Sequence, residues 1–367
     1  MKENLFSLAL VLFFLIIAIK FFVTILNLKF NLSLNFQFAL YTVLLMIISY
    51  TYEPSIYSDL YRLFHTMDVM RTFNQSFYND YEYITSMLFS ISVKFEDNSI
   101  LPLIITSIRY SLFFTCLIIF KNKYKLTSQE MNLYLIIFFA YFPVIESISG
   151  IRYYFAVTIF FVFFILWNFF EKKKIFILGI ITPIFVHVSS LMIIIVFLLS
   201  LIKKKVNFLI FNVILLTWMF WQEQIIIILN YFSNPFSIYL RNTLIIYLED
   251  EREISINLTL ARLIFLIIIF TILYTMYIKK SVYIQRNLNY FRFITLYISF
   301  CLGSLLNSVF FQRNIFVLAI CIFPLIVFFY KDQSIRKYQK IFLFIMLLTM
   351  SFLMYLNQIY GVLYGYF

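Results

Sequence analysis

The chain has little of what soluble proteins use to build loops, disulfides and charged surfaces. Its 367 residues include 5 Gly, 6 Pro and 3 Cys, and 13% of them are charged. So few Gly and Pro argue against disordered linkers and collagen-like repeats. Cys116, Cys301 and Cys321 lie in apolar runs, without the paired spacing of disulfides or metal sites. These shortages exclude an ordinary soluble domain, which needs more charge to cover its surface.

Apolar and aromatic residues take the place of charge. The chain is 63% hydrophobic, with 49 Phe, 28 Tyr and a mean hydropathy of +0.94. This composition predicts an all-α, polytopic integral membrane protein in which residues 1–367 form a single polytopic domain. We expect about ten full transmembrane helices, because ten apolar stretches approach the length needed to cross a bilayer: 5–26, 34–50, 99–120, 131–145, 151–170, 206–221, 259–278, 293–310, 314–330 and 341–357.

Residues 175–202 do not fit a simple crossing, because a lysine triplet flanks them on each side, at 172–174 and 203–205. One crossing would leave one triplet outside, and the segment is too short for two. We therefore expect a broken or re-entrant hairpin with its break near His187. One long tilted helix with lysines snorkelling at its ends is the alternative.

The division of charge predicts the orientation. Lysines crowd the short loops at 121–125, 172–174, 203–205, 279–280 and 331–340, which we therefore place in the cytoplasm, with both termini outside. The net charge of +12 thus reflects topology, and no nucleic-acid partner is expected.

The other side carries most of the acids and arginines. Of the 17 acidic residues, only Glu130, Glu171 and Asp332 fall in the predicted cytoplasmic loops. Most arginines also lie on the outer side, where two larger loops are expected at 51–98 and 222–258. Because the planar guanidinium group binds phosphate and carboxylate groups through paired hydrogen bonds, we predict that the functional site lies on the outer face.

The first outer loop carries carboxylates flanked by tyrosines. Tyr57, Asp59 and Tyr61 lie close together, and Glu82 stands between two further tyrosines. Such acids can accept hydrogen bonds from sugar hydroxyls while the rings stack on the sugar's apolar face. The alternative is an aromatic belt at the membrane interface with charge-paired acids.

Three arginines and one histidine lie within or beside apolar runs. Arg109, Arg152 and Arg313 are functional candidates, because charge at membrane depth is costly. The alternatives are a structural ion pair, such as Arg152 with Glu146, or snorkelling to the headgroups. His187 stands at the expected break, although a lone histidine in an apolar segment is often only a packing residue. The nucleotide-binding, zinc-protease and serine-hydrolase motifs are missing, so neither a cofactor nor a metal is expected.

These elements occur in an order that is similar to that of a known family. They are Tyr57, Asp59 and Tyr61, then Glu82, then Gly150-Ile151-Arg152-Tyr153-Tyr154-Phe155-Ala156, then His187-Val188-Ser189-Ser190, and a late Arg313. Over about residues 40–330 the pattern resembles the EpsG family of exopolysaccharide proteins, which is similar to the Wzy polymerases of O-antigen and capsule assembly. The chain departs from that pattern at Ser58, where a Gly-Thr-Asp run is common, and at Tyr153, where Gln is common.

The resemblance implies a glycosyltransferase that polymerises oligosaccharide repeat units at the outer or periplasmic face of the bacterial plasma membrane. A glycan growing on undecaprenyl diphosphate would be transferred to a new lipid-linked unit, in O-antigen, lipopolysaccharide, capsule or exopolysaccharide synthesis. The implied partners are the undecaprenyl-diphosphate-linked oligosaccharide, membrane lipid and a chain-length regulator.

The charged residues can be given roles in such a reaction. We predict that Arg152 and Arg313 bind the donor diphosphate, with Arg109 as a weaker third candidate, because paired guanidinium groups can stabilise a developing negative charge. His187 is the better candidate for the base, since Asp59 or Glu82 would need a raised pKa to serve. The candidate sugar-binding residues are Tyr57, Tyr61 and Tyr153.

Other activities remain open from the sequence alone. An O-antigen ligase or another lipid-linked glycosyltransferase would use a similar donor. A non-enzymatic flippase of the lipid-linked sugar is less favoured, because few polar residues line the predicted cytoplasmic halves of the spans. An acyltransferase would also use a histidine near the outer membrane surface.

Overall fold

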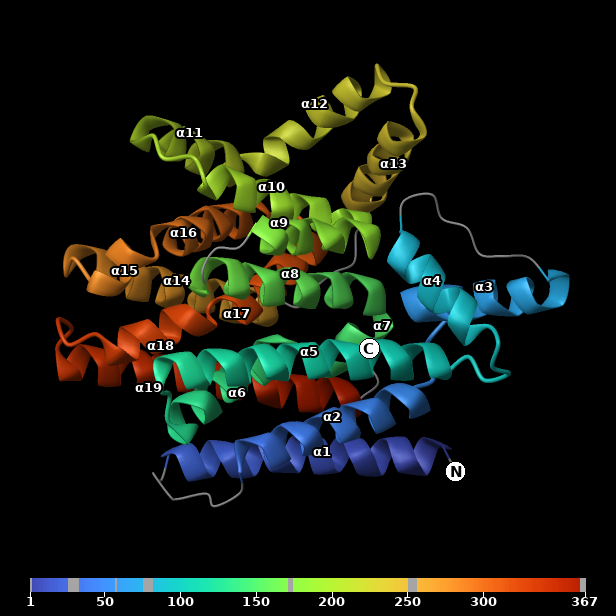
Figure 1. The fold of residues 1–367 in the computed structure, drawn as a ribbon, viewed down its shortest axis with the longest axis horizontal. Coiled ribbons are helices and arrows are strands. Elements are labelled where there is room, and N and C mark those ends of the chain that lie inside the picture. The colour runs from blue at the N-terminus through green and yellow to red at the C-terminus, as the bar shows by residue number, and fades with distance from the viewer. Residues whose placement is uncertain are drawn as a thin grey trace. The chain divides into compact units, whose positions relative to one another are not determined.

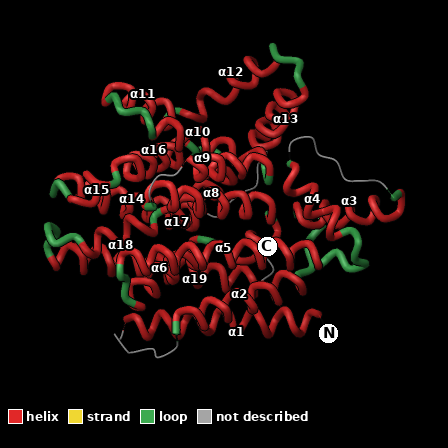
Figure 2. Tube along the Cα trace, in the orientation of Figure 1, coloured by secondary structure: helices red, strands yellow, loops and turns green. Residues whose placement is uncertain are grey.

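The computed structural model describes residues 2–25, 33–56, 58–74, 82–170, 174–249 and 256–363. The described chain is helical, and loops join the helices (Figures 1 and 2). Its contacts divide it into two compact units: unit 1 is Met1–Ser190 with Gln358–Phe367, and unit 2 is Leu191–Asn357. That the whole chain forms a single domain stays a prediction.

Unit 1 holds the first nine α-helices and two short 3₁₀ turns. They are α1 Lys2–Ile25, α2 Leu34–Thr51, α3 Asp59–Phe73, α4 Tyr83–Ser92, α5 Ile100–Tyr124, α6 Ser128–Tyr141, α7 Val144–Ser149, α8 Ile151–Phe169, α9 Lys174–Ile181, η1 Thr182–Phe185 and η2 Val188–Ser190. Helix α2 packs between α1 and α5, α5 packs on α8, and α8 packs on α9.

Unit 2 holds the later helices. They are α10 Leu191–Ser200, α11 Lys205–Leu216, α12 Trp218–Asn230, α13 Pro235–Glu249, α14 Ile256–Ile278, α15 Val282–Arg286, α16 Leu288–Gly303, α17 Ser308–Cys321, α18 Phe323–Lys331 and α19 Lys337–Leu363, whose last residues belong to unit 1. Helix α16 packs against α10, α11, α14 and α17.

The protein is a polytopic membrane protein, with fewer full spans than the ten expected. Six helices of the described chain are long and apolar enough to cross: α1, α2, α5, α8, α14 and α19. The number rises to eight if two bent pairs each count as one span. Two expected spans became helices that are too short, the 14-residue α6 and the 16-residue α16. Two more broke, with bends of 86° between α11 and α12 and 47° between α17 and α18. The expected number of spans came from the lengths of apolar stretches, and these lengths do not show where a helix ends or bends.

Within unit 2, the bend between α11 and α12 lies where the chain passes close to α16. A Cβ on Gly303 of α16 would lie 2.2 Å from the carbonyl oxygen of Leu215 and 2.8 Å from that of Leu216. Only glycine allows this close approach of two backbones. Thr217, between the two helices, donates its hydroxyl to the carbonyl of Val213 at 2.9 Å, which also favours bending.

Helix α1 shows how a span divides between protein and lipid. Leu8, Val11 and Leu15 are exposed at helical spacing, whereas Phe13 and Ile17 are almost fully buried on another face. An apolar face left uncovered by protein is what lipid requires. Helix α8 is the contrasting case, because 83% of its apolar window is buried, against 33% for α1.

The expected break near His187 is present. The α-helix stops at Ile181, and regular α-helix resumes at Leu191. Pro183 has no N–H to continue the helix, so the chain turns through η1 instead. A Cβ on Gly179 would lie 2.2 Å from the ring of Phe163, so glycine lets α9 lie close against α8 just before the break.

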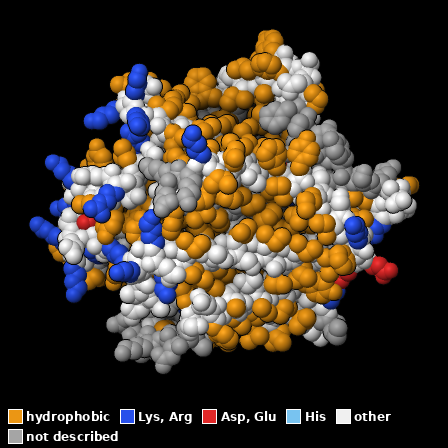
Figure 3. Space-filling model, viewed as in Figure 1, with side chains coloured by type: hydrophobic (Ala, Val, Ile, Leu, Met, Phe, Trp, Pro, Cys, Tyr) orange, Lys and Arg blue, Asp and Glu red, His pale blue; other side chains and the backbone are white. Residues whose placement is uncertain are grey.

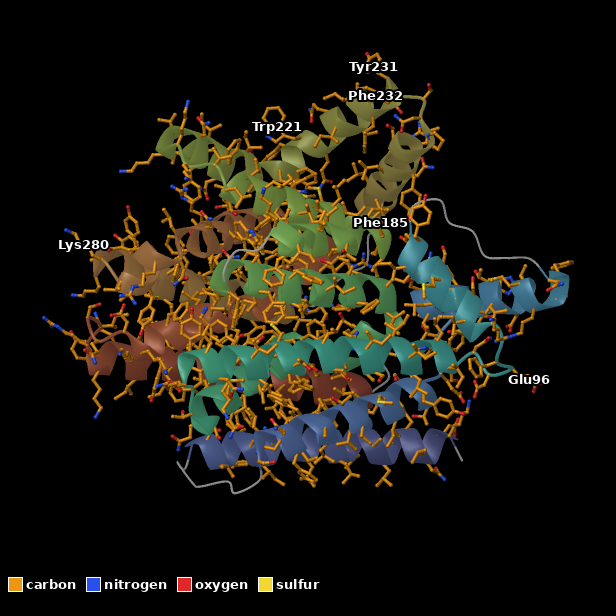
Figure 4. All side chains as sticks on the ribbon, viewed as in Figure 1. Glu96, Phe185, Trp221, Tyr231, Phe232 and Lys280 are labelled. Atoms are coloured by element: carbon orange, nitrogen blue, oxygen red, sulfur yellow. The ribbon has the colours of Figure 1, made fainter. Side chains whose placement is uncertain are left out.

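The two ends of unit 1 differ in charge. Helix α5 ends in the lysine-rich stretch at 121–125, and its first residue, Ile100, lies at the other end, near Asp97 and the start of α1. In the space-filling view, acidic side chains are visible at the right, where Figure 4 labels Glu96 of unit 1 (Figures 3 and 4).

Candidate active site

Four of the predicted site residues lie together in unit 1. They are Asp59 at the start of α3, Glu82 just before α4, Arg152 at the start of α8, and His187 at the break. The contacts that join them span 93, 70 and 105 residues of sequence. We call these four residues the charged cluster.

Arg152 binds both carboxylates of the charged cluster. Its Nη2 donates to Oδ1 of Asp59 at 2.9 Å and its Nε donates to Oδ2 at 3.3 Å, which is a bidentate arrangement. Its Nη1 donates to Oε2 of Glu82 at 2.8 Å. Arg62, one turn along α3, adds a longer ion pair to Asp59 at 3.7 Å. Arg152 therefore ties α3 and α4 to the first turn of α8.

His187 contacts the other oxygen of Glu82. The distance from Nδ1 of His187 to Oε1 of Glu82 is 2.8 Å. Because an ionised carboxylate only accepts hydrogen bonds, Nδ1 carries the proton and donates it to this bond. In a neutral ring this leaves Nε2 with its lone pair, ready to accept a proton.

The electrostatics keep both acids ionised. Burial alone would raise the pKa of Glu82, but the hydrogen bond from His187 and the charge of Arg152 outweigh it and lower that pKa to about 2. Burial also opposes the ionisation of Asp59, yet Arg152 holds its pKa below the usual value. Neither acid has the raised pKa that a general base would need. Two carboxylates also face one guanidinium, so a diphosphate here would meet excess negative charge.

The charged cluster is partly accessible. The side chain of Glu82 is 0% exposed, whereas those of His187, Arg152 and Asp59 are 14%, 16% and 24% exposed. Glu82 thus lies beneath the other three side chains, which reach the surface.

Local sequence explains how α3 and α4 present the acids. Ser58 caps α3 by accepting a hydrogen bond from the backbone N–H of Tyr61 at 3.1 Å, which places Asp59 in the first turn, where a negative charge is favoured. Ser58, one of the two departures from the family pattern, thus has a structural role. In α4, Thr85 donates its hydroxyl to the carbonyl of Val186 at 2.6 Å.

Thr85 was not anticipated from the sequence. It lies three residues after Glu82, so both point to the same side of the chain and both reach the break. Its hydroxyl satisfies a carbonyl that the interrupted helix leaves open, as non-helical backbone at membrane depth requires. Phe185 of η1, labelled in Figure 4, packs against the first residue of α4, with its ring centroid 6.1 Å from that of Tyr83.

Arg109 lies apart from these contacts. It is 1% exposed, and it donates to the carbonyl of Ser147 at 2.7 Å and to the hydroxyl of Ser147 at 3.0 Å. Its guanidinium carbon lies 4.4 Å from the ring centre of Tyr110 and 5.8 Å from that of Phe142. No acidic side chain of the described residues forms an ion pair with it. These contacts are those of a packing residue, so its predicted contact with diphosphate gains no support.

The three tyrosines predicted to bind sugar have different surroundings. Tyr57 lies outside the described residues. Tyr61 is 43% exposed on α3. Tyr153 is buried, with its ring edge-on to that of His187 at a centroid distance of 6.1 Å. Tyr153 is thus placed to orient the imidazole.

Arg313 belongs to unit 2, in the second turn of α17, and is partly buried. The neighbouring Gln312 accepts a hydrogen bond at 3.2 Å from Arg262 of α14, which is 2% exposed. The predicted role of Arg313 in binding diphosphate stays a prediction.

Among the described residues, no group of three His, Cys, Asp or Glu side chains is arranged to hold a metal ion. Comparison with known proteins yields no match, whether to a family model, a curated protein or a solved structure.

Proposed function

We propose that this protein is a polysaccharide repeat-unit polymerase, a glycosyltransferase that acts on undecaprenyl-diphosphate-linked oligosaccharides at the outer face of the bacterial plasma membrane. The resemblance of its motifs to the EpsG family suggests the reaction. The observation that carries the proposal is the charged cluster, in which a histidine, an arginine and two carboxylates from distant parts of the sequence contact one another in one unit of a polytopic membrane protein.

The positive-inside rule supports the outer location. In unit 1, α5 runs from Ile100 to the lysines at 121–125, and such lysine-rich ends lie in the cytoplasm. Helix α8 begins beside the charged cluster and ends just before the lysines at 172–174. Both helices therefore place the charged cluster at the end opposite to the lysines.

The proposed chemistry is one displacement at the donor sugar. An acceptor hydroxyl of the new unit attacks the anomeric carbon of the growing glycan, and the bond from that carbon to the diphosphate oxygen breaks. Undecaprenyl diphosphate leaves with the electron pair. Nε2 of His187 takes the hydroxyl proton, while Glu82 holds the ring through Nδ1 and stabilises the imidazolium that forms.

In this scheme the carboxylates and Arg152 position the base. Arg152 fixes Glu82, and Asp59 in turn fixes Arg152 through two hydrogen bonds. The outward-facing part of Asp59 is available to the acceptor's hydroxyls. Because both carboxylates occupy its guanidinium, Arg152 acts as a positioning residue in this scheme. Binding of the leaving diphosphate by Arg313 stays a separate prediction.

The test uses a strain from which this gene has been deleted, followed by gel analysis of its surface and lipid-linked glycans. We expect only single repeat units, and a ladder of long chains once the wild-type gene is restored. The variant His187→Ala, expressed at wild-type level, should leave single units. The control Glu96→Gln changes an exposed acid outside the charged cluster and should restore the ladder.

Each contrary result has a definite meaning. Normal surface polymer in the deletion strain would overturn the proposal. Long polymer that accumulates on its lipid carrier would identify a ligase instead. Repeat units trapped on the cytoplasmic face would indicate a flippase.

A further inference from the structure

Unit 1 also contains a cavity of about 330 Å³, at the lower end of the size range of small-ligand sites. It lies where α1 begins at Lys2, α2 ends near Thr51, and α5 is about to begin at Ser99. One stripe of α3, which includes Tyr61 and Asp68, forms a wall. Three spans therefore have their ends at this cavity, on the same side of the unit as the charged cluster.

Aromatic rings form much of the lining. Tyr50, Tyr52, Tyr61 and Phe64 all line the cavity. Rings of this kind offer flat apolar faces, and three of the four also carry a hydroxyl that can exchange hydrogen bonds. Tyr61 is 43% exposed, so its ring is available to a ligand.

Hydrogen-bond acceptors stand beside the rings. Glu53 and Asp68 both line the cavity, and both are exposed. Asn98 donates through Nδ2 to Oδ1 of Asp68 at 2.9 Å, which fixes the orientation of its amide. Its own Oδ1 is buried and accepts no hydrogen bond from the described residues. Such an atom is costly unless a ligand or water satisfies it.

The cavity is poorly suited to an anion. Lys2 is the lysine of its lining, and its Nζ already donates to Oδ2 of Asp97 at 2.9 Å. Tyr50 donates to the same oxygen at 3.0 Å. Asp68 is paired with Arg71 at 3.0 Å, and His65 also lines the cavity, whereas Glu53 forms no ion pair among the described residues. The charge of Glu53 therefore disfavours a phosphate. A purely apolar ligand would leave these polar groups unsatisfied.

The cavity is distinct from the charged cluster, although α3 contributes to both. Asp59, which reaches Arg152, and Asp68, which lines the cavity, are nine positions apart, or about two and a half helical turns. They therefore lie on opposite sides of α3. The buried residues Leu63 and Met67 face the core between these two sides.

We propose that this cavity is a glycan-binding subsite that holds sugars of the polymer away from the bond being formed. Aromatic faces beside carboxylate, amide and phenol groups match a sugar ring, which has an apolar face and hydroxyls at its edge. The identity of the glycan rests on the proposed polymerase function. Binding remote from the reaction keeps a long chain associated between transfers, so the subsite sets chain length more than it sets the first transfer.

The binding test uses purified protein and the repeat-unit oligosaccharide released by mild acid from the lipid-linked units of the deletion strain. Saturation-transfer NMR and calorimetry would measure its affinity. We expect Tyr61→Ala and Asp68→Asn each to weaken binding about tenfold, a change that corresponds to the loss of one good contact. Tyr61→Phe should retain most of the affinity. The matched control is Phe73→Ala, which removes another exposed ring of α3 that does not line the cavity.

In cells, the same two variants should shorten the glycan ladder yet still produce dimers of the repeat unit. Unchanged affinity and unchanged ladders in Tyr61→Ala and Asp68→Asn would contradict the proposed subsite but would not contradict the proposed polymerase function. If deletion of the gene left polymer unchanged, the polymerase would fail. Binding of the oligosaccharide that is lost in Tyr61→Ala but kept in Phe73→Ala would then still support the subsite.

Discussion

Two arginines with the same local sequence have opposite surroundings. Arg109 and Arg152 both stand in an Ile-Arg-Tyr run at an apolar segment, at 108–110 and 151–153. Arg109 is buried against the carbonyl and hydroxyl of Ser147 and aromatic rings, whereas Arg152 binds two carboxylates near the surface. An arginine at membrane depth therefore does not by itself mark a site, and its partners decide whether it does structural or chemical work.

The largest expected effect comes from changing Glu82, the buried acid that contacts Arg152 and that has no counterpart beside Arg109 among the described residues. Glu82→Gln keeps the shape of the side chain but removes the charge that orients His187, so the base loses its fixed tautomer. We expect the polymerisation rate to fall by about 10²–10⁴, as is typical for loss of general-base catalysis. The rate is measured from ladder formation at matched protein levels. Glu96→Gln, an exposed acid, is the control, and a wild-type rate in Glu82→Gln would remove Glu82 from the site.

The next prediction compares the same substitution at the two arginines, Arg152→Lys and Arg109→Lys. Arg152→Lys loses the bidentate contact with Asp59 while it keeps the charge, so we expect a rate at least about tenfold lower. Arg109→Lys loses hydrogen bonds to Ser147 and should lower the free energy of unfolding by about 1–3 kcal/mol. Its rate per folded molecule should not change. Detergent thermal melts and ladder rates, measured on both variants, separate the two roles.

Acid should unfold the two regions differently. Glu82 has a pKa of about 2 when folded, against an ordinary 4.5, so the unfolded chain binds more protons in this range. The stability from its contacts is complete above about pH 4.5 and is lost as the pH falls toward about 2. Melting temperatures of Glu82→Gln should therefore fall less with acid than those of wild type. Arg109→Lys should keep the wild-type slope, since Arg109 has no acidic partner in the described chain.

The smallest expected effect comes from the hydrogen bond that stabilises the helix break near His187. Thr85→Val removes the hydroxyl that satisfies the carbonyl of Val186, and should cost about 1–2 kcal/mol of stability. The rate should fall by less than in Glu82→Gln, because the charges remain in place. Thr72→Val is the control, since its hydroxyl bonds only within α3 and is exposed. Equal losses in the two variants would show that the contact with Val186 has no special role.

The sequence predicted the membrane class and the break near His187, because each depends on local composition or charge. It singled out Asp59, Glu82, Arg152 and His187 one by one, and their roles stay predictions. It did not predict which acid pairs with Arg152, since those contacts span 70 and 93 residues. Nor could it separate Arg109 from Arg152, because the difference lies in neighbours contributed by distant segments. The number of spans was overestimated, since hydropathy does not reveal the bends between α11 and α12 and between α17 and α18.

The most direct test of the central claim is a reconstituted reaction. Purified protein in liposomes would receive lipid-linked repeat units extracted from the deletion strain, and the products would be resolved as a ladder. Wild type and Arg109→Lys should build long chains at similar rates per folded molecule, and His187→Ala should build none. A folded His187→Ala protein that polymerises at the wild-type rate, or a wild-type protein that forms no chains, would contradict the account.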